Sequence, residues 1–295
     1  LIGFAGDSCT GKSSLAELFT DLFPRKESIL IRGDNYHAWD RRSSMWRVMT
    51  HLNPKANDLS ALVRDVRWVI NHRNSSFRTL EYNHENGLFD REISIRGSSI
   101  VVVEGLHVLT CGNLNDRFDV SCFLSVEEDL RVAVKVKRDI AERNHRCADI
   151  LASIESRSND YMRYLEPQRN KARLAFHIRK ASEMRFEGHD FSDFDKLILD
   201  ISFVDCYVEN EIIQVLAGIC GLSVSVDTNH DRDLTVFCVS GRVGREDLWL
   251  ATKVLLPRFS ALVRKEAFTD GIFGVMQFFL LVVLSQRITE LGGRV

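Results

Sequence analysis

The chain has 295 residues, of which 45% are hydrophobic and 27% are charged, and its formal net charge at pH 7 is −2. Such a chain can bury a large core, and the near balance of charge excludes an overall basic field for binding nucleic acid or an anionic membrane surface. Its seven cysteines include no C-x-x-C pair, which argues against a disulfide framework or a structural zinc site. We therefore expect a cytoplasmic globular protein without nucleic-acid or membrane partners.

A short apolar strand, Leu1–Ala5, leads directly into a glycine-rich segment that matches the phosphate-binding pattern G-x-x-x-x-G-K-[ST] at each defined position. Apolar residues after Lys12 recur with helical spacing, so the motif lies between a strand and a helix. The glycines let backbone N–H groups wrap a phosphate, the lysine reaches the outer phosphates, and the hydroxyl holds Mg²⁺. We predict a nucleotide site formed by Gly6, Asp7, Ser8, Cys9, Thr10, Gly11, Lys12, Ser13 and Ser14.

Asp34 follows a second predicted strand, Ser28–Arg32. An acidic side chain at the carboxyl end of a strand faces the crevice where open α/β sheets bind ligands, so Asp34 is a candidate catalytic base. It is equally a common turn-forming residue at the end of a strand. His37 and Arg41 lie close behind it and suit recognition of hydroxyl and phosphate groups, although the same residues also fit a solvated loop.

Glu104 ends a third apolar strand, Ser99–Val103. A carboxylate in this position reaches Mg²⁺ or its waters in P-loop enzymes, and it can also cap a helix. Since a P-loop is present, we favour the role on the metal, together with Ser13. Between the second and third strands, a helix is predicted over residues 59–70 and a long loop or hairpin over Arg73–Arg96, in which His84 is either a surface residue or a substrate contact.

Basic side chains gather in and after a helix predicted over residues 127–142, and the following segment, Ala148–Lys171, is helical and basic with a break at Pro167. Charged helix faces are usually solvated. Cations on a mobile helical segment can also close over phosphates during transfer. We interpret residues 138–170 as a lid.

The last hundred residues are richer in short predicted strands than the rest of the chain. Short strands are predicted over residues 197–203, 222–226 and 234–239, and helices over 246–264 and 272–291. The most apolar stretch, Ile272–Leu284, is short for a membrane span and contains Gln277, so we predict a buried helix. The whole is an α/β fold: a P-loop kinase-type sheet with helices on both faces in a core of residues 1–195, and a mixed, β-rich extension over 196–295 packed on the same sheet.

In order along the first 175 residues, the motifs resemble those of the phosphoribulokinase/uridine kinase family of P-loop kinases. The resemblance is carried by Gly6–Ser13, Gly33–His37 with Asp40 and Arg41, Leu52–Asp58, Tyr82–His84 with Gly87, Val103–His107, Lys137–Arg143, and Pro167 with Gln168. It implies an ATP- and Mg²⁺-dependent kinase that acts on a small molecule. Ribulose 5-phosphate is the first expected acceptor, another sugar or sugar phosphate the second, and uridine or cytidine the third.

The resemblance also implies roles for individual residues. Asp34 is then the catalytic base, and Glu104 is the acid that holds Mg²⁺ with Ser13. The remaining roles fall to Lys12, Arg138 and Asp139 in catalysis and to His37, Arg41, Tyr82, His84 and Arg143 in substrate binding. We expect a homo-oligomer.

Two departures from the family pattern stand out. Plant and cyanobacterial members carry a redox cysteine where this chain has Thr10, and its partner cysteine where this chain has Arg32, so the resemblance implies that the disulfide switch is absent. Thr79 and Leu80 replace the usual Lys-Pro before Tyr82. A protein of another class, a nucleotide-binding regulator with little turnover, would keep the loop, but the presence of both Asp34 and Glu104 argues against it.

Overall fold

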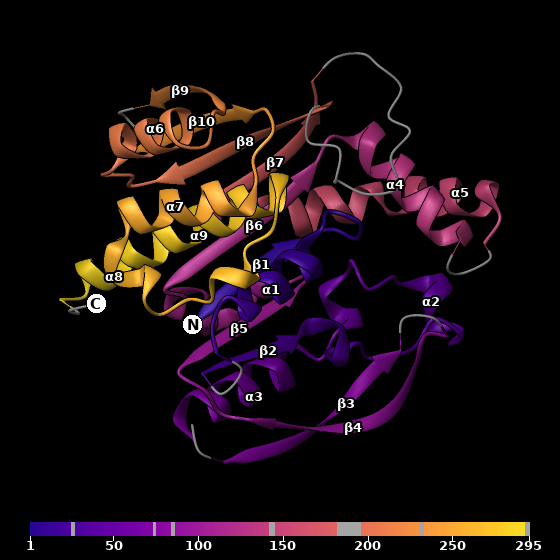
Figure 1. The fold of residues 1–295 in the computed structure, drawn as a ribbon. Coiled ribbons are helices and arrows are strands. Elements are labelled where there is room, and N and C mark those ends of the chain that lie inside the picture. Colours follow the sequence, from indigo (N-terminus) through magenta and orange to yellow (C-terminus); the bar gives the residue numbers. More distant parts are fainter. Residues whose placement is uncertain are drawn as a thin grey trace.

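The structure is a computed structural model that describes residues 1–24, 27–72, 75–83, 86–141, 145–181, 196–229 and 233–292. Eight strands of this part of the chain form one mixed sheet (Figure 1). In spatial order the strands are β2 (Ser28–Arg32), β5 (Ile100–Gly105), β1 (Ile2–Gly6), β6 (Val120–Val126), β7 (Leu174–Lys180), β8 (Leu197–Val204), β10 (Leu234–Ser240) and β9 (Ser223–Asn229). The first five strands in this order run parallel to one another, whereas β8, β10 and β9 are each antiparallel to their neighbours.

Helices cover both faces of this sheet. The helices α1 (Lys12–Asp21) and α9 (Gly271–Glu290) pack on the face that includes Phe4, whereas α3 (Leu59–Asn71) packs on the face that includes Ala5. Successive strand residues point to opposite faces, and a parallel strand covered on both faces is therefore apolar throughout. The central strand β1 is accordingly buried along its whole length. The prediction of an α/β fold with helices on both faces of the sheet is confirmed.

The predicted lid segment is helical. It begins within α4 (Glu128–Ala141) and continues as α5 (Cys147–Asp160), and these two helices lie together at one side of the molecule (Figure 1). A π-helical turn, Tyr161–Leu165, and a 3₁₀ segment, Glu166–Lys171, follow. The helix thus becomes irregular just before Pro167, which cannot donate a backbone hydrogen bond.

Residues 73–96 are predicted as a long loop or hairpin, and the described residues among them form a hairpin. Its strands β3 (Ser76–Asn83) and β4 (Leu88–Arg96) make a separate two-stranded sheet. The short helix α2 (Met45–Val48) was not predicted; four residues are too few for a periodic signal.

The C-terminal third differs from the prediction in three elements. The strand β7 was missed because it carries basic residues and pairs with strands that are distant in the sequence. The helix α6 (Glu209–Gly218) was also missed. The helix predicted over 246–264 is instead α7 (Arg245–Leu255) followed by the short α8 (Pro257–Ser260), since Pro257 interrupts the hydrogen-bond pattern. The three predicted strands are present as β8, β9 and β10, in the same sheet as β1.

Helix α9 combines apolar composition with one buried amide. It is long and apolar enough to span a membrane, but most of that apolar window is buried, and the helix contacts α1, α7 and β6. Gln277, fully buried within it, donates to the carbonyls of Leu18 and Ala267, and its Oε1 accepts from the backbone and hydroxyl of Thr269. The amide therefore fixes α9 to α1 and to the preceding loop.

Replacing Gln277 by Leu should destabilise the fold. The carbonyls of Leu18 and Ala267 and the N–H of Thr269 would lose their partner inside the core, which we expect to cost about 2–4 kcal/mol. Urea denaturation measures the free energy of unfolding. The control is Met276→Leu, a swap of similar volume at the adjacent buried position, for which we expect a loss below about 1.5 kcal/mol. Equal losses in both variants would contradict the anchoring role of Gln277.

Candidate active site

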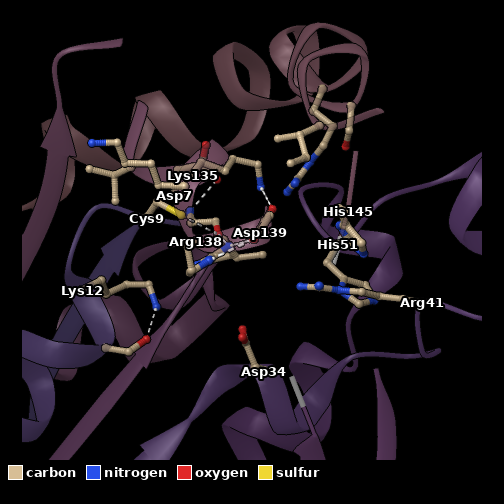
Figure 2. A pocket seen from close by; sticks show the side chains of 18 of the residues that line it. Asp7, Cys9, Lys12, Asp34, Arg41, His51, Lys135, Arg138, Asp139 and His145 are labelled. Atoms are coloured by element: carbon tan, nitrogen blue, oxygen red, sulfur yellow. Dashed lines mark hydrogen bonds and ion pairs between the residues drawn. The ribbon is translucent and has the colours of Figure 1, made fainter. Parts of the chain in front are cut away.

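A large cavity lies at the carboxyl ends of the parallel strands. Its volume is about 1120 Å³. The P-loop, the turn after β2, and the helices α4 and α5 supply most of its lining (Figure 2). Parallel α/β sheets bind ligands at this edge, because the loops that follow the strands converge there.

The P-loop has a backbone shape that its glycines permit. Gly6 has φ 152°, and a Cβ there would lie 2.4 Å from the carbonyl oxygen of Leu124 on the neighbouring strand. Gly11, with φ 83°, is the residue before α1. Because Gly11 has no side chain, no side-chain oxygen caps the first N–H groups of α1. These N–H groups and the helix dipole together favour binding of an anion.

Lys12, Ser13 and Glu104 meet beside this loop. The register of the sheet places Glu104 of β5 opposite Phe4 of β1, and the Lys12 Nζ forms an ion pair with Glu104. The hydroxyl of Ser13 donates to the same carboxylate at 3.2 Å. Burial by itself lowers the pKa of Lys12, but the carboxylates of Glu104, Asp34 and Asp7 outweigh it and raise the pKa above its ordinary value. Lys12 is therefore a fixed positive charge.

Asp34 enters the cavity from the 3₁₀ turn η1 (Gly33–Tyr36) that follows β2. Its side chain is 23% exposed and points toward the open space, with Lys12 on one side and Arg41 on the other (Figure 2). Gly33 permits the turn to lie against β5, because a Cβ there would be only 2.9 Å from the carbonyl oxygen of Glu104. Asp34 is thus accessible to a bound molecule and near the P-loop lysine.

Three histidines are packed behind Asp34. The ring of His37 stacks on that of His51 with centroids 3.4 Å apart, and the Nε2 of His37 lies 3.5 Å from Asp34. Burial lowers the pKa of His51 to about 3 and that of His107 to about 4, so both rings are neutral at physiological pH. Sequence reasoning identified His37 but missed His51 as a lining residue, because its position depends on the stack.

Arg41 lines the opposite side of the cavity. Its guanidinium lies 5.8 Å from the ring centroid of Trp46, and its Nε is buried without a hydrogen-bond partner among the described residues. The hairpin holds it in place: Gly87, with φ 72°, comes so close that a Cβ would be 2.9 Å from the Cβ of Arg41. Tyr82 of β3 is buried and packs edge-on against His37, with centroids 4.9 Å apart. His84, predicted in the same hairpin, lies outside the described residues.

Helix α4 presents cations to the P-loop. Arg138 bonds to Asp139 and to the hydroxyl of Ser8, and Lys135 lies 3.5 Å from Asp139. One turn earlier, Arg131 forms a 2.9 Å ion pair with Asp7 of the loop itself. The buried Asp139 therefore holds two cations at the cavity. Arg143, also predicted here, lies outside the described residues.

Helix α5 adds Arg157 to the same group of cations. Arg157 lines the cavity, and its Nε has no hydrogen-bond partner among the described residues. Burial lowers its pKa, although the charge persists. Sequence reasoning placed Arg157 in the lid and Lys135 in the basic helix before it, without singling out either as a site residue. For Lys135 the signal was present, because residues 131, 135 and 138 share one helix face.

Most of the predicted residues that the structure describes lie together. Four of these residues do not line the cavity but lie next to residues that do: Gly6, Thr10, Tyr82 and Glu104. The predicted residues that line it are Asp7, Ser8, Cys9, Gly11, Lys12, Ser13, Ser14, Asp34, His37, Arg41, Arg138 and Asp139.

Comparison with known proteins agrees with this geometry. The model of the "Phosphoribulokinase / Uridine kinase family" matches residues 1–184, which is more than half of the chain. The chain belongs to this family. The resemblance of the motifs is thereby confirmed, and the match ends before the β8–β10 part of the sheet.

Individual relatives come from both branches of the family. A phosphoribulokinase from Synechocystis sp. is 35% identical over 178 residues, which are 60% of this chain and 53% of that protein. A uridine kinase from Streptococcus agalactiae is 26% identical over 58% of this chain and 83% of that protein. The matches thus span about half the length of the phosphoribulokinase relatives. In a structural comparison, a phosphoribulokinase from Rhodobacter spheroides gives a TM-score of 0.64 at 21% identity, covering 90% of this chain and 97% of that one, so the fold is shared.

Proposed function

We propose that this protein is a kinase that transfers the γ-phosphoryl group of ATP to a hydroxyl of a small sugar phosphate, most directly ribulose 5-phosphate. The observation that carries the proposal is that Lys12 and Asp34 line one cavity while Glu104 pairs with Lys12 behind it. Phosphoryl transfer needs positioning and charge stabilisation more than covalent chemistry. Here Lys12 and the cations of α4 and α5 bind the phosphates of ATP, and Asp34 accepts the proton of the attacking hydroxyl.

The residues also suit Mg²⁺. The hydroxyl of Ser13 and the carboxylate of Glu104 are hard oxygen ligands, and they lie 3.2 Å apart beside the P-loop. Mg²⁺ neutralises charge on the β- and γ-phosphates when it is bound with ATP. Glu104 is only 2% exposed and is paired with Lys12, so binding of the phosphates must draw Lys12 away from it. The carboxylate then becomes available to the metal or to its waters.

Arg41 supports a phosphorylated acceptor. A guanidinium binds a phosphate through two parallel hydrogen bonds and keeps its charge at all physiological pH values. Arg41 lies across the cavity from the P-loop, with Asp34 between them (Figure 2). A sugar phosphate held there by its phosphate would present a hydroxyl to Asp34. The phosphoribulokinase relatives add support, whereas the uridine kinase from Streptococcus agalactiae keeps a nucleoside acceptor as the second candidate.

We further propose a cytoplasmic homo-oligomer with small-molecule substrates and with neither nucleic-acid nor membrane partners. The net charge of −2 supports the part of this proposal that concerns nucleic acid, and the burial of α9 supports the part that concerns the membrane. The proposed division into a kinase core, residues 1–195, and an extension, residues 196–295, gives the extension a role in sheet packing or assembly.

Replacing Asp34 by Asn should reduce kcat by about 10²–10⁴-fold, since the amide keeps the size of the side chain but cannot accept the proton. Steady-state kinetics with MgATP and ribulose 5-phosphate measure this loss. The matched control is Asp58→Asn, which exchanges the same groups at the N-cap of α3, where Asn caps as well as Asp. A loss of less than tenfold for Asp34→Asn would reduce Asp34 to a binding residue.

Replacing Arg41 by Ala should raise KM for ribulose 5-phosphate roughly tenfold or more, with a smaller effect on KM for ATP, because a charged hydrogen bond to the acceptor is lost. Arg42→Ala, at the exposed neighbouring position, should leave both values unchanged. If uridine is the acceptor, the change at Arg41 should be mild, because a nucleoside carries no phosphate. Comparable increases in both KM values would refute a specific role on the acceptor.

A further inference from the structure

Asn57 lies beside His37 although 20 residues separate them. The two form an isolated antiparallel bridge, in which Ala38 N donates to Ala56 O at 2.9 Å and Asp58 N donates to Tyr36 O at 2.7 Å. The Oδ1 of Asn57 lies 2.7 Å from the Nδ1 of His37. The contact between the two side chains is thus fixed by the backbone as well.

The orientation of the Asn57 amide follows from its other contacts. Its Nδ2 donates to the carbonyl oxygens of His51 at 2.9 Å and of Asn53 at 3.0 Å. Carbonyl oxygens only accept hydrogen bonds, so the NH₂ group must face them and the amide oxygen must face His37. Nδ1 of His37 therefore carries a proton. When the ring is neutral, its other nitrogen, Nε2, bears a lone pair and lies 3.5 Å from Asp34.

The two neighbouring histidines each use one ring nitrogen in a hydrogen bond to a backbone carbonyl. Nε2 of His51 donates to the carbonyl of Trp39, and Nε2 of His107 donates to the carbonyl of His51. Burial lowers the pKa of both rings. Within the described residues, the ionisable groups near His37 include Asp34, His51, Tyr82 and His107, and Arg41 acts on His51.

We infer that Asn57 is a positioning residue that holds the proton of His37 on Nδ1, so that Nε2 can take from Asp34 the proton released by the acceptor hydroxyl. This inference rests on the proposed kinase function. The side chain of His37 is only 4% exposed, so its ring exchanges protons with the cavity through Asp34. The neutral amide of Asn57 adds no negative charge that would hold the ring permanently as imidazolium, unlike the aspartate of a serine-protease triad.

The transfer step balances as follows. The acceptor O–H bond breaks, its proton goes to Asp34, and its electron pair forms the new bond to the γ-phosphorus. The bond between the γ-phosphorus and the bridging oxygen breaks, and ADP leaves with that electron pair. The proton then moves from Asp34 to Nε2 of His37, whose Nδ1–H remains bonded to Asn57. After the products leave, the proton returns through Asp34 to solvent.

The tautomer can be tested directly. Long-range ¹H–¹⁵N correlation spectra distinguish which imidazole nitrogen carries the proton, and the His37→Gln variant identifies the signals of His37. In the wild-type protein at alkaline pH, we expect neutral His37 with its proton on Nδ1. A proton on Nε2 overturns the inference. This measurement needs no acceptor, so it tests the effect of Asn57 on the His37 tautomer separately from the proposed function, and a proton on Nε2 would overturn the inference even in an active kinase.

A double-mutant cycle tests whether Asn57 acts through His37. We expect Asn57→Ala to lower kcat roughly tenfold or more, with KM for ATP unchanged, and to cause no further loss in a His37→Gln background. Asn53→Ala is the matched control: it removes another Asn side chain of this loop, whose Oδ1 accepts a hydrogen bond from the backbone N–H of Lys55 rather than facing His37. We expect it to leave kcat unchanged.

A merely structural role of Asn57 would give a different pattern. Asn57→Ala would then cost the same factor with His37 and without it, and Asn53→Ala would cost a similar factor. Either result overturns the inference. Thermal unfolding of each variant reports whether it folds. If Asn57→Ala does not fold, the tautomer of His37 in the wild-type protein still tests the inference.

Discussion

The buried ion pair between Lys12 and Glu104 is the constraint on which the site depends. Lys12 begins the helix after β1, Glu104 lies near the carboxyl end of the adjacent parallel strand β5, and both residues are almost completely buried. An unpaired charge in such a place costs several kcal/mol, so each residue requires the other when no phosphate is bound. In the proposed function, the phosphates of a nucleotide offer Lys12 a stronger partner and free Glu104. The same pair would then preserve the loop before binding and make the carboxylate available to the metal.

The other charges of the site are arranged around this pair. Arg131 connects α4 to the P-loop through Asp7, so the helix that carries Lys135 and Arg138 is fixed to the loop that receives the nucleotide. On the opposite side, Asp34 and Arg41 lie on the segment that follows β2, against the hairpin and the stacked histidines. The proposed donor and acceptor sites are thus built from separate elements that meet at the edge of one sheet.

Local patterns in the sequence predicted the features that have local causes. The P-loop, Asp34 and Glu104 each follow an apolar strand, and parallel strands bring their carboxyl ends together without further information. Other contacts between segments that are distant in the sequence were not predicted. The stack of His51 on His37, the placement of Arg157 and the bridge between His37 and Asn57 arise only when separate segments pack. The strand β7 belongs to the same class, since both of its partners are distant in the chain.

The most direct test is transfer of label from γ-labelled ATP. The protein is incubated with ATP and Mg²⁺ and, in separate reactions, with ribulose 5-phosphate, uridine and cytidine, with the Lys12→Ala variant as the blank. We expect labelled product with ribulose 5-phosphate, abolished by chelation of Mg²⁺ and absent with Lys12→Ala. Transfer to none of these acceptors, or undiminished transfer by Lys12→Ala, would contradict the assignment of this site as a phosphoryl-transfer centre.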